Sequence, residues 1–139
     1  MIYSFLQNGD SAVTVQFKNE ISEEVNRRVT GLCNRIEAKH INGIIELVPT
    51  FASLTVFYDC TIISSKKLKK KIKSLINGGE CDVKSTAKVW NIPVCYDDEF
   101  ALDMKNVCSH TALEREEVIK LHTSKPYLIY MLGFLPGFA

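Results

Sequence analysis

The chain has 139 residues, of which 46% are hydrophobic and 24% charged, and 17 basic against 16 acidic residues leave a net charge of +1. This composition is typical of a globular protein with one domain or two small ones, and the balanced charge argues against a global attraction to nucleic acid or to an anionic membrane. No apolar run approaches the roughly 18 residues that span a bilayer, and the N-terminus lacks the basic and long apolar segments of a signal peptide, so we expect a cytosolic protein.

The first forty residues predict two strands followed by a helix. Residues 1–6 and 11–17 have strand character and flank Asn8-Gly9, a dipeptide typical of a two-residue type I′ hairpin turn. Between residues 21 and 40 the apolar spacing changes to that of a helix with one apolar stripe. That stripe consists of Ile21, Val25, Val29, Leu32 and Ile36.

Residues 41–79 repeat this order. Strands are predicted at residues 44–48 and 54–58, and a lysine-rich helix at residues 64–76. Residues 1–79 therefore predict the order β-β-α-β-β-α, which we interpret as an α+β two-layer sandwich with one antiparallel sheet covered on one side by two helices. A basic helix can bind a membrane surface or nucleic acid, but this one has no aromatic residue and no arginine, so we interpret its lysines as a solvated face.

A second unit is predicted after a polar, unpatterned linker at residues 80–87. It begins with a strand at residues 88–96 and a helix at 100–108. A second helix follows the capping-box pattern Thr-Ala-Leu-Glu at 111–114 and ends at His122.

The C-terminal stretch predicts a buried strand at residues 127–132 and then a bent loop, because glycine and proline interrupt the apolar run. Large apolar side chains on such a loop need a covering surface. The chain ends one residue after the loop, so we expect that surface to lie in a missing segment or in another molecule. The loop consists of Gly133, Phe134, Leu135, Pro136, Gly137 and Phe138.

Metal and nucleophile motifs are absent from the sequence. The five cysteines never form a Cys-x-x-Cys pair, which argues against a zinc site, a redox motif and a disulfide scaffold. We expect reduced thiols with no shared role. There is also no phosphate-binding loop, no Gly-x-Ser-x-Gly and no His-Glu-x-x-His motif.

Several blocks, in order, resemble the family of the 5-oxoprolinase B subunit (PxpB), which includes KipI and allophanate hydrolase subunit 1. The Gly-Phe-Leu-Pro-Gly-Phe block is the most specific of them. The blocks are Gly-Asp-Ser-Ala (9–12), Ile-Pro-Val-Cys-Tyr (92–96), His-Thr-Ala-Leu (110–113), Glu-Glu-Val-Ile-Lys-Leu-His (116–122) and Tyr-Met-Leu-Gly-Phe-Leu-Pro-Gly-Phe (130–138).

The resemblance implies a β-β-α-β-β-α first domain, and it implies that residues 88–139 are the incomplete start of a cyclophilin-like, carboxyltransferase-type β-barrel. It also implies a role in an enzyme that opens 5-oxoproline to glutamate with ATP, together with partner subunits A and C. ATP would then be a cofactor of the assembled complex, and the chain alone would be inactive. Activation of an amide carbonyl requires electrostatic stabilisation and a positioned acid or base.

The candidate site residues follow from the same resemblance. His122 lies at a family-matched position and is a possible catalytic acid, base or substrate contact, although a histidine at a helix C-terminus can equally serve the helix dipole. No metal ligand is predicted. The candidates for a substrate-facing or partner-facing surface are Tyr127, Gly133, Phe134, Leu135, Pro136, Gly137 and Phe138.

Two other interpretations stay open at this stage. Some relatives bind a histidine kinase and inhibit its autophosphorylation, a task that requires an apolar surface rather than chemistry. In addition, an incomplete barrel leaves strand edges that can pair with another chain, so we expect a homodimer in which two copies exchange their terminal strands.

Overall fold

The computed structural model describes residues 3–78, 88–133 and 135. The chain divides into two compact units, one made of residues 1–84 with 129–139 and the other of residues 85–128. The predicted linker at residues 80–87 lies outside the described residues. The predicted domain boundaries stay a prediction.

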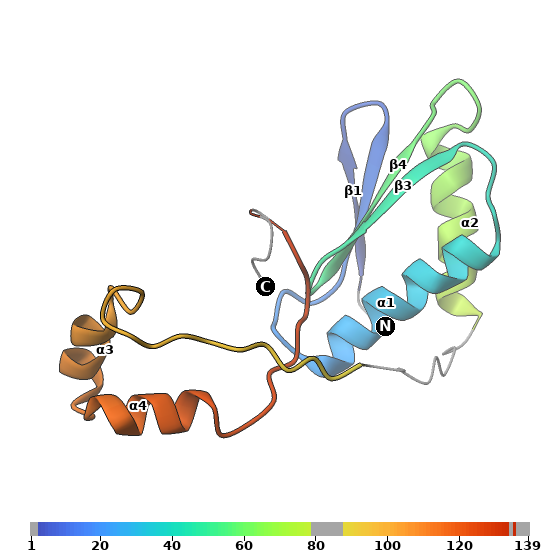
Figure 1. The fold of residues 1–139 in the computed structure, drawn as a ribbon. Coiled ribbons are helices and arrows are strands. Elements are labelled where there is room, and N and C mark those ends of the chain that lie inside the picture. The colour runs from blue at the N-terminus through green and yellow to red at the C-terminus, as the bar shows by residue number, and fades with distance from the viewer. Residues whose placement is uncertain (1–2, 79–87, 134, 136–139) are drawn as a thin grey trace. The chain divides into compact units, whose positions relative to one another are not determined.

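The first unit contains a four-stranded antiparallel sheet with the order β1-β2-β4-β3 (Figure 1). Its elements follow the order β-β-α-β-β-α along the chain, as the sequence predicts. They are β1 (Ser4–Asn8), β2 (Ala12–Gln16), α1 (Glu23–Ala38), β3 (Ile44–Pro49), β4 (Ser53–Tyr58) and α2 (Ser65–Asn77).

The hairpin between β1 and β2 is confirmed, but its turn differs from the predicted type I′ turn. Asn8 pairs with Ala12 at the end of the ladder, so the loop has three residues and Asn8 belongs to the strand. Gly9 takes a left-handed backbone conformation with φ of +62°, whereas Asn8 is not among the residues with positive φ. The asparagine side chain instead donates a hydrogen bond to Thr14 Oγ1 over 2.7 Å.

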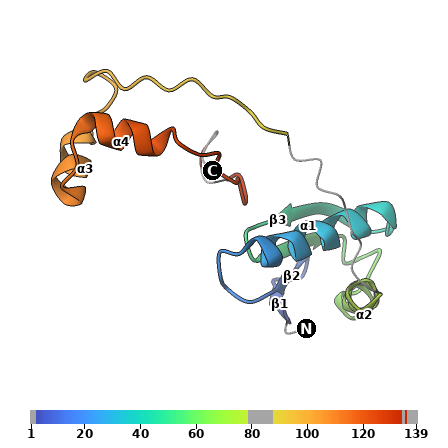
Figure 2. The same cartoon turned by 90° about the horizontal axis from the view of Figure 1, so that it is seen from below.

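One apolar core joins the sheet to both helices of this unit. Alternate residues of the two central strands are fully buried, as are the residues of α1 spaced three or four apart. Figure 2 shows α2 almost end on while α1 runs across the view. The most deeply buried side chains are Val13, Val15, Val29, Leu32, Ile36, Leu54, Val56, Tyr58, Leu68 and Ile72.

The start of α1 is later than the sequence predicts. Ser22 is the N-cap residue and Ile21 lies before the helix with 75% of its surface exposed, so Ile21 is not part of the apolar stripe. Glu23 and Glu24 occupy the first turn, where the positive end of the helix dipole stabilises negative charge. Helix α2 begins after Ser64, whose side chain accepts a hydrogen bond from the Lys67 backbone N–H.

Gly43 shapes the entry into β3. Its φ is +93°, a backbone conformation that other residues rarely adopt. A Cβ atom at this position would lie 2.7 Å from Ile63 Cγ2 and 3.1 Å from Ile62 Cγ2. Both the backbone and the packing therefore require glycine here.

The second unit contains two short helices, α3 (Met104–Thr111) and α4 (Arg115–His122) (Figure 1). The helix predicted at residues 100–108 begins later, because the backbone N–H groups of Phe100 and Ala101 both bond to the Asp97 carbonyl and form a separate turn. The capping box is also displaced. It joins Glu114 to Glu117 at the start of α4, whereas α3 ends at Ala112 in a left-handed conformation.

The strands predicted at residues 88–96 and 127–132 do not form. A strand needs a neighbouring strand for its backbone hydrogen bonds, and neither segment pairs with another strand in the described part of the chain. Their apolar side chains are exposed rather than buried. The most exposed are Val89, Trp90, Ile92, Val94, Tyr127, Leu128, Ile129 and Leu132.

Within residues 3–78, 88–133 and 135, no helix is both long enough and apolar enough to cross a bilayer.

Candidate functional site

The candidate site is centred on His122, the last residue of α4. Its Nδ1 atom is hydrogen-bonded to the Tyr96 hydroxyl, and the two rings meet edge to face with centroids 5.9 Å apart. The Tyr127 ring also contacts the histidine, with centroids 5.7 Å apart and the ring planes tilted by 45°. The three rings therefore form an aromatic cluster, Tyr96–His122–Tyr127.

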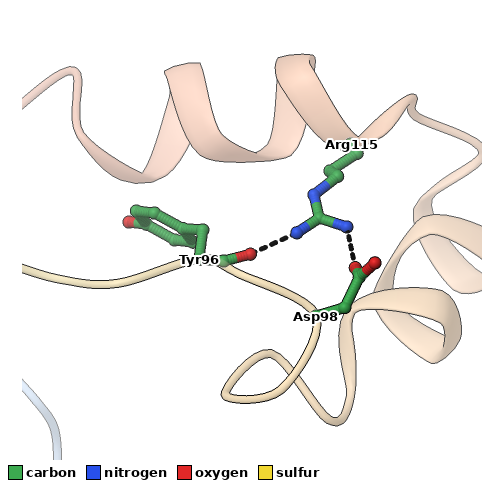
Figure 3. Close-up of polar contacts among 3 residues, drawn as sticks. All are labelled: Tyr96, Asp98 and Arg115. Carbon is green, nitrogen blue, oxygen red and sulfur yellow. Dashed lines mark hydrogen bonds and ion pairs between the residues drawn. The ribbon is translucent and has the colours of Figure 1, made fainter.

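A polar latch holds the start of α4 to the segment that carries Tyr96 (Figure 3). Arg115 donates one guanidinium N–H to the backbone carbonyl of Tyr96 and pairs through another with the carboxylate of Asp98. The hydrogen bond from Arg115, and then its charge, lower the pKa of the Asp98 carboxyl. The same hydrogen bond raises the pKa of Arg115.

The geometry of α4 explains why one helix supplies both contacts. Arg115 and His122 are seven residues apart, which is close to two helical turns, so both side chains leave the same face. They are about 10 Å apart along the axis. The Glu114–Glu117 capping box fixes the start of the helix, and Lys120 and His122 lie in the last turn, where positive charge is favoured.

The cluster has the chemistry of a proton-transferring or hydrogen-bonding site rather than of a metal centre. Among the described residues there is no group of three or more His, Cys, Asp or Glu side chains that could hold a metal ion. The Nε2 atom of His122 has no hydrogen-bond partner in the same part of the chain and is available to a ligand. Lys125 adds a positive charge nearby, with its Nζ atom 5.7 Å from the centroid of the Tyr127 ring.

The structure brings together only two of the predicted site residues, His122 and Tyr127. Gly133 and Leu135 lie in irregular chain, where the Leu135 N–H bonds to the Gly133 carbonyl over 2.8 Å, and 59% of Leu135 is exposed. A side chain of α1 reaches the same stretch, because Asn26 donates a hydrogen bond to the Tyr130 carbonyl over 2.9 Å. Phe134, Pro136, Gly137 and Phe138 lie outside the described residues.

Tyr96, Asp98 and Arg115 are functional candidates that the sequence does not single out. Asp98 belongs to an acidic run that is typical of the beginning of a helix, and Arg115 resembles an ordinary helix residue. The spacing of seven between Arg115 and His122 is the only signal that could have linked them, since it places both on one face of a short helix.

A second concave region lies in the first unit and is lined by residues of α1, β3 and the loop between them, including Glu37, His40 and Glu46. Cys33 lies one turn before Glu37, and burial, followed by the Glu37 charge, raises the pKa of its thiol. A raised thiol pKa disfavours the reactive thiolate. The described cysteines are all free, in line with the prediction of reduced thiols.

The family of the chain is clear from its sequence. A sequence profile described as carboxyltransferase domain, subdomain C and D, matches residues 3–139, so the chain belongs to this family. The 5-oxoprolinase B subunit of Bacillus subtilis (strain 168) is 40% identical over 98% of this chain. The corresponding protein of Escherichia coli O157:H7 is 23% identical over 94% of it. The resemblance to the 5-oxoprolinase B subunit is confirmed.

The chain is shorter than these relatives. It spans 61% of the length of the Bacillus subtilis protein and 58% of that of the Escherichia coli protein.

Solved structures of related proteins show the same fold. The protein TTHA0988 matches 91% of this chain, and 23% of its own length, with a TM-score of 0.71 and 32% identity. The urea carboxylase of Kluyveromyces lactis matches 94% of this chain, and 14% of its own length, with a TM-score of 0.73. Its identity is 19%, so it supports the fold alone.

Proposed function

We propose that the chain is part of a subunit of an ATP-dependent 5-oxoprolinase, which opens 5-oxoproline to glutamate only when partner subunits A and C are present. The observation that carries the proposal is the 40% identity, over 98% of the chain, to the 5-oxoprolinase B subunit of Bacillus subtilis. The fold in this proposal is finer than the sheet and helices described above. Residues 1–79 form a two-layer sandwich, and residues 88–139 are the first part of a cyclophilin-like barrel.

The dependence on partners is supported by how little catalytic machinery the chain offers. His122 is a single candidate acid, base or donor, and the described residues contain no cluster suited to a metal ion. Opening a cyclic amide with ATP also requires groups that hold phosphates and stabilise the developing charge. In the proposal these groups, and the ATP site, are completed by the assembled complex.

The test is an assay of ATP-dependent glutamate release from 5-oxoproline. The chain, and a longer form that extends to the length of its relatives, are co-expressed with candidate subunits A and C. Glutamate release that needs ATP, both partners and this chain or its longer form is the expected result. Rapid turnover by the chain in isolation would contradict the proposal, as would full activity of the partners without it.

The alternative prediction, inhibition of a histidine kinase, would use an exposed apolar surface. In the second unit Trp90, Ile92 and Leu121 are each more than half exposed, so such a surface exists. Autophosphorylation of a candidate kinase, measured with and without the chain, distinguishes the two functions. The strand-exchanged homodimer stays a prediction, and light scattering checks it.

A further inference from the structure

The two ring nitrogens of His122 have different surroundings. Nδ1 is hydrogen-bonded to the Tyr96 hydroxyl, whereas Nε2 is without a hydrogen-bond partner in residues 3–78, 88–133 and 135. In a neutral imidazole one nitrogen carries the proton and the other has a lone pair, and the hydrogen bond made by one nitrogen decides the state of the other.

We infer that Tyr96 donates its hydroxyl proton to Nδ1 and so holds His122 in the tautomer that carries its proton on Nε2. The lone pairs of a phenol oxygen are partly shared with its ring, which makes the phenol a better donor than acceptor. The imidazole lone pair is a strong acceptor, so O–H to N is the stronger of the two possible arrangements. His122 then presents an N–H donor to a ligand, not a base.

This assignment names the kind of ligand group that the site binds, and it rests on the proposed function for the identity of the substrate. A neutral imidazole N–H binds a carbonyl or carboxylate oxygen, and the bond strengthens as negative charge grows on that oxygen. Lys125, beside the Tyr127 ring, adds a cation that favours the same anionic group. His122 thereby acts as a hydrogen-bond donor to the oxygen of a cyclic amide or its carboxylate.

Arg115 is a positioning residue for this arrangement. It binds the backbone carbonyl of Tyr96, and its charge is balanced by Asp98 (Figure 3). The same helix carries His122 at its other end. Arg115 therefore fixes the distance between the backbone of Tyr96 and the imidazole that its hydroxyl contacts.

The tautomer is measured by ¹⁵N NMR of the His122 ring at a pH at which the ring is neutral. In the unmodified chain we expect a pyridine-like Nδ1 signal and a pyrrole-like Nε2 signal. Tyr96→Phe removes the donor and is expected to shift both signals towards the average of the two tautomers. Arg115→Ala is expected to shift them in the same direction. Tyr130→Phe, which removes a hydroxyl outside the cluster, serves as the matched control and should leave them unchanged.

A protonated Nδ1 in the unmodified chain would overturn the inference, as would identical spectra for the unmodified chain and Tyr96→Phe. Circular dichroism of each variant shows whether the helices are retained. Since this measurement needs neither ATP nor partner subunits, its outcome does not depend on whether the 5-oxoprolinase assay succeeds.

The donor role is tested separately in the assembled enzyme. His122→Ala is expected to lower kcat roughly 100-fold, the typical cost of losing one donor to a developing oxyanion. His122→Gln keeps an amide N–H near the position of Nε2 and is expected to recover a measurable part of that loss. Equal activity of His122→Gln and His122→Ala, at either a low or an unchanged level, would overturn the donor role.

Discussion

Helices α1 and α4 both have the spacing of amphipathic helices, yet α1 buries six residues and α4 buries none. Helix α1 lies against a sheet whose central strands supply a second apolar layer, and the two surfaces exclude water together. In the described part of the second unit, no such layer faces α4. An apolar stripe therefore predicts a helix, but its contribution to stability depends on a second surface elsewhere in the chain or in a partner.

The largest expected effect comes from the core of the first unit. Leu32 is fully buried, so Leu32→Ala should lower the free energy of unfolding by about 2–5 kcal/mol. Leu121→Ala is the matched control in α4, where 57% of the side chain is exposed, and it should cost no more than about 0.5 kcal/mol. Urea unfolding followed by circular dichroism compares the two. Equal losses would show that the second unit has a core of its own.

Gly43 provides a second, smaller test of the first unit. Gly43→Ala should destabilise the fold by about 1–3 kcal/mol, because of its positive φ and the close approach of Ile63. Gly31 in α1 has open space where a Cβ would lie, so Gly31→Ala should be neutral or stabilise by up to about 1 kcal/mol. Thermal unfolding of both variants gives the sign, and a stable Gly43→Ala protein would contradict the packing at the start of β3.

In the second unit the measurable effect is a local dependence on pH. The folded-state pKa of Asp98 is depressed by Arg115, so the latch contributes stability above the unfolded pKa of the carboxyl, near its ordinary value of 3.8. This contribution is lost as the pH falls through the lower, folded value. NMR signals of Tyr96 and Arg115 should therefore change in the acidic range, while the core of the first unit does not. In Asp98→Asn the same change should be absent.

The smallest effect is expected at the lysines of α2. Lys67, Lys70 and Lys71 make no ion pair with any described residue. Replacing the three with Gln should change the free energy of unfolding by less than about 0.5 kcal/mol, because exposed charges contribute little. Denaturant titration checks this, and a pull-down with candidate subunits A and C checks assembly. A marked loss of partner binding would identify the helix as an interface.

The sequence predicts the first unit well because its patterns are local and agree with each other. The order of strands and helices is confirmed, and the stripe through Val25, Val29, Leu32 and Ile36 is buried as expected. The errors concern single residues at the ends of elements. Ile21 lies outside α1, and Asn8 belongs to β1 rather than to a type I′ turn.

The rest of the chain is predicted less well because strands depend on partners distant in sequence. The runs at 88–96 and 127–132 have the composition of strands, but composition does not supply the neighbouring strand that would pair with them. The aromatic cluster is missed for a similar reason. His122 is found through a family-matched position, whereas Tyr96 and Arg115 gain their roles only from a fold that brings residues 17 to 26 positions apart into contact.

The strand order β1-β2-β4-β3 also constrains how the first unit folds. Each hairpin, β1 with β2 and β3 with β4, closes a short loop, and such pairings form within microseconds. The contact between β2 and β4, in which Thr14 and Thr55 hydrogen-bond over 2.8 Å, joins residues 41 positions apart. The chain must enclose α1 and β3 before that contact forms, so docking of the two hairpins carries most of the loop-closure entropy. Folding of this unit is therefore limited by the meeting of two preformed hairpins at the centre of the sheet.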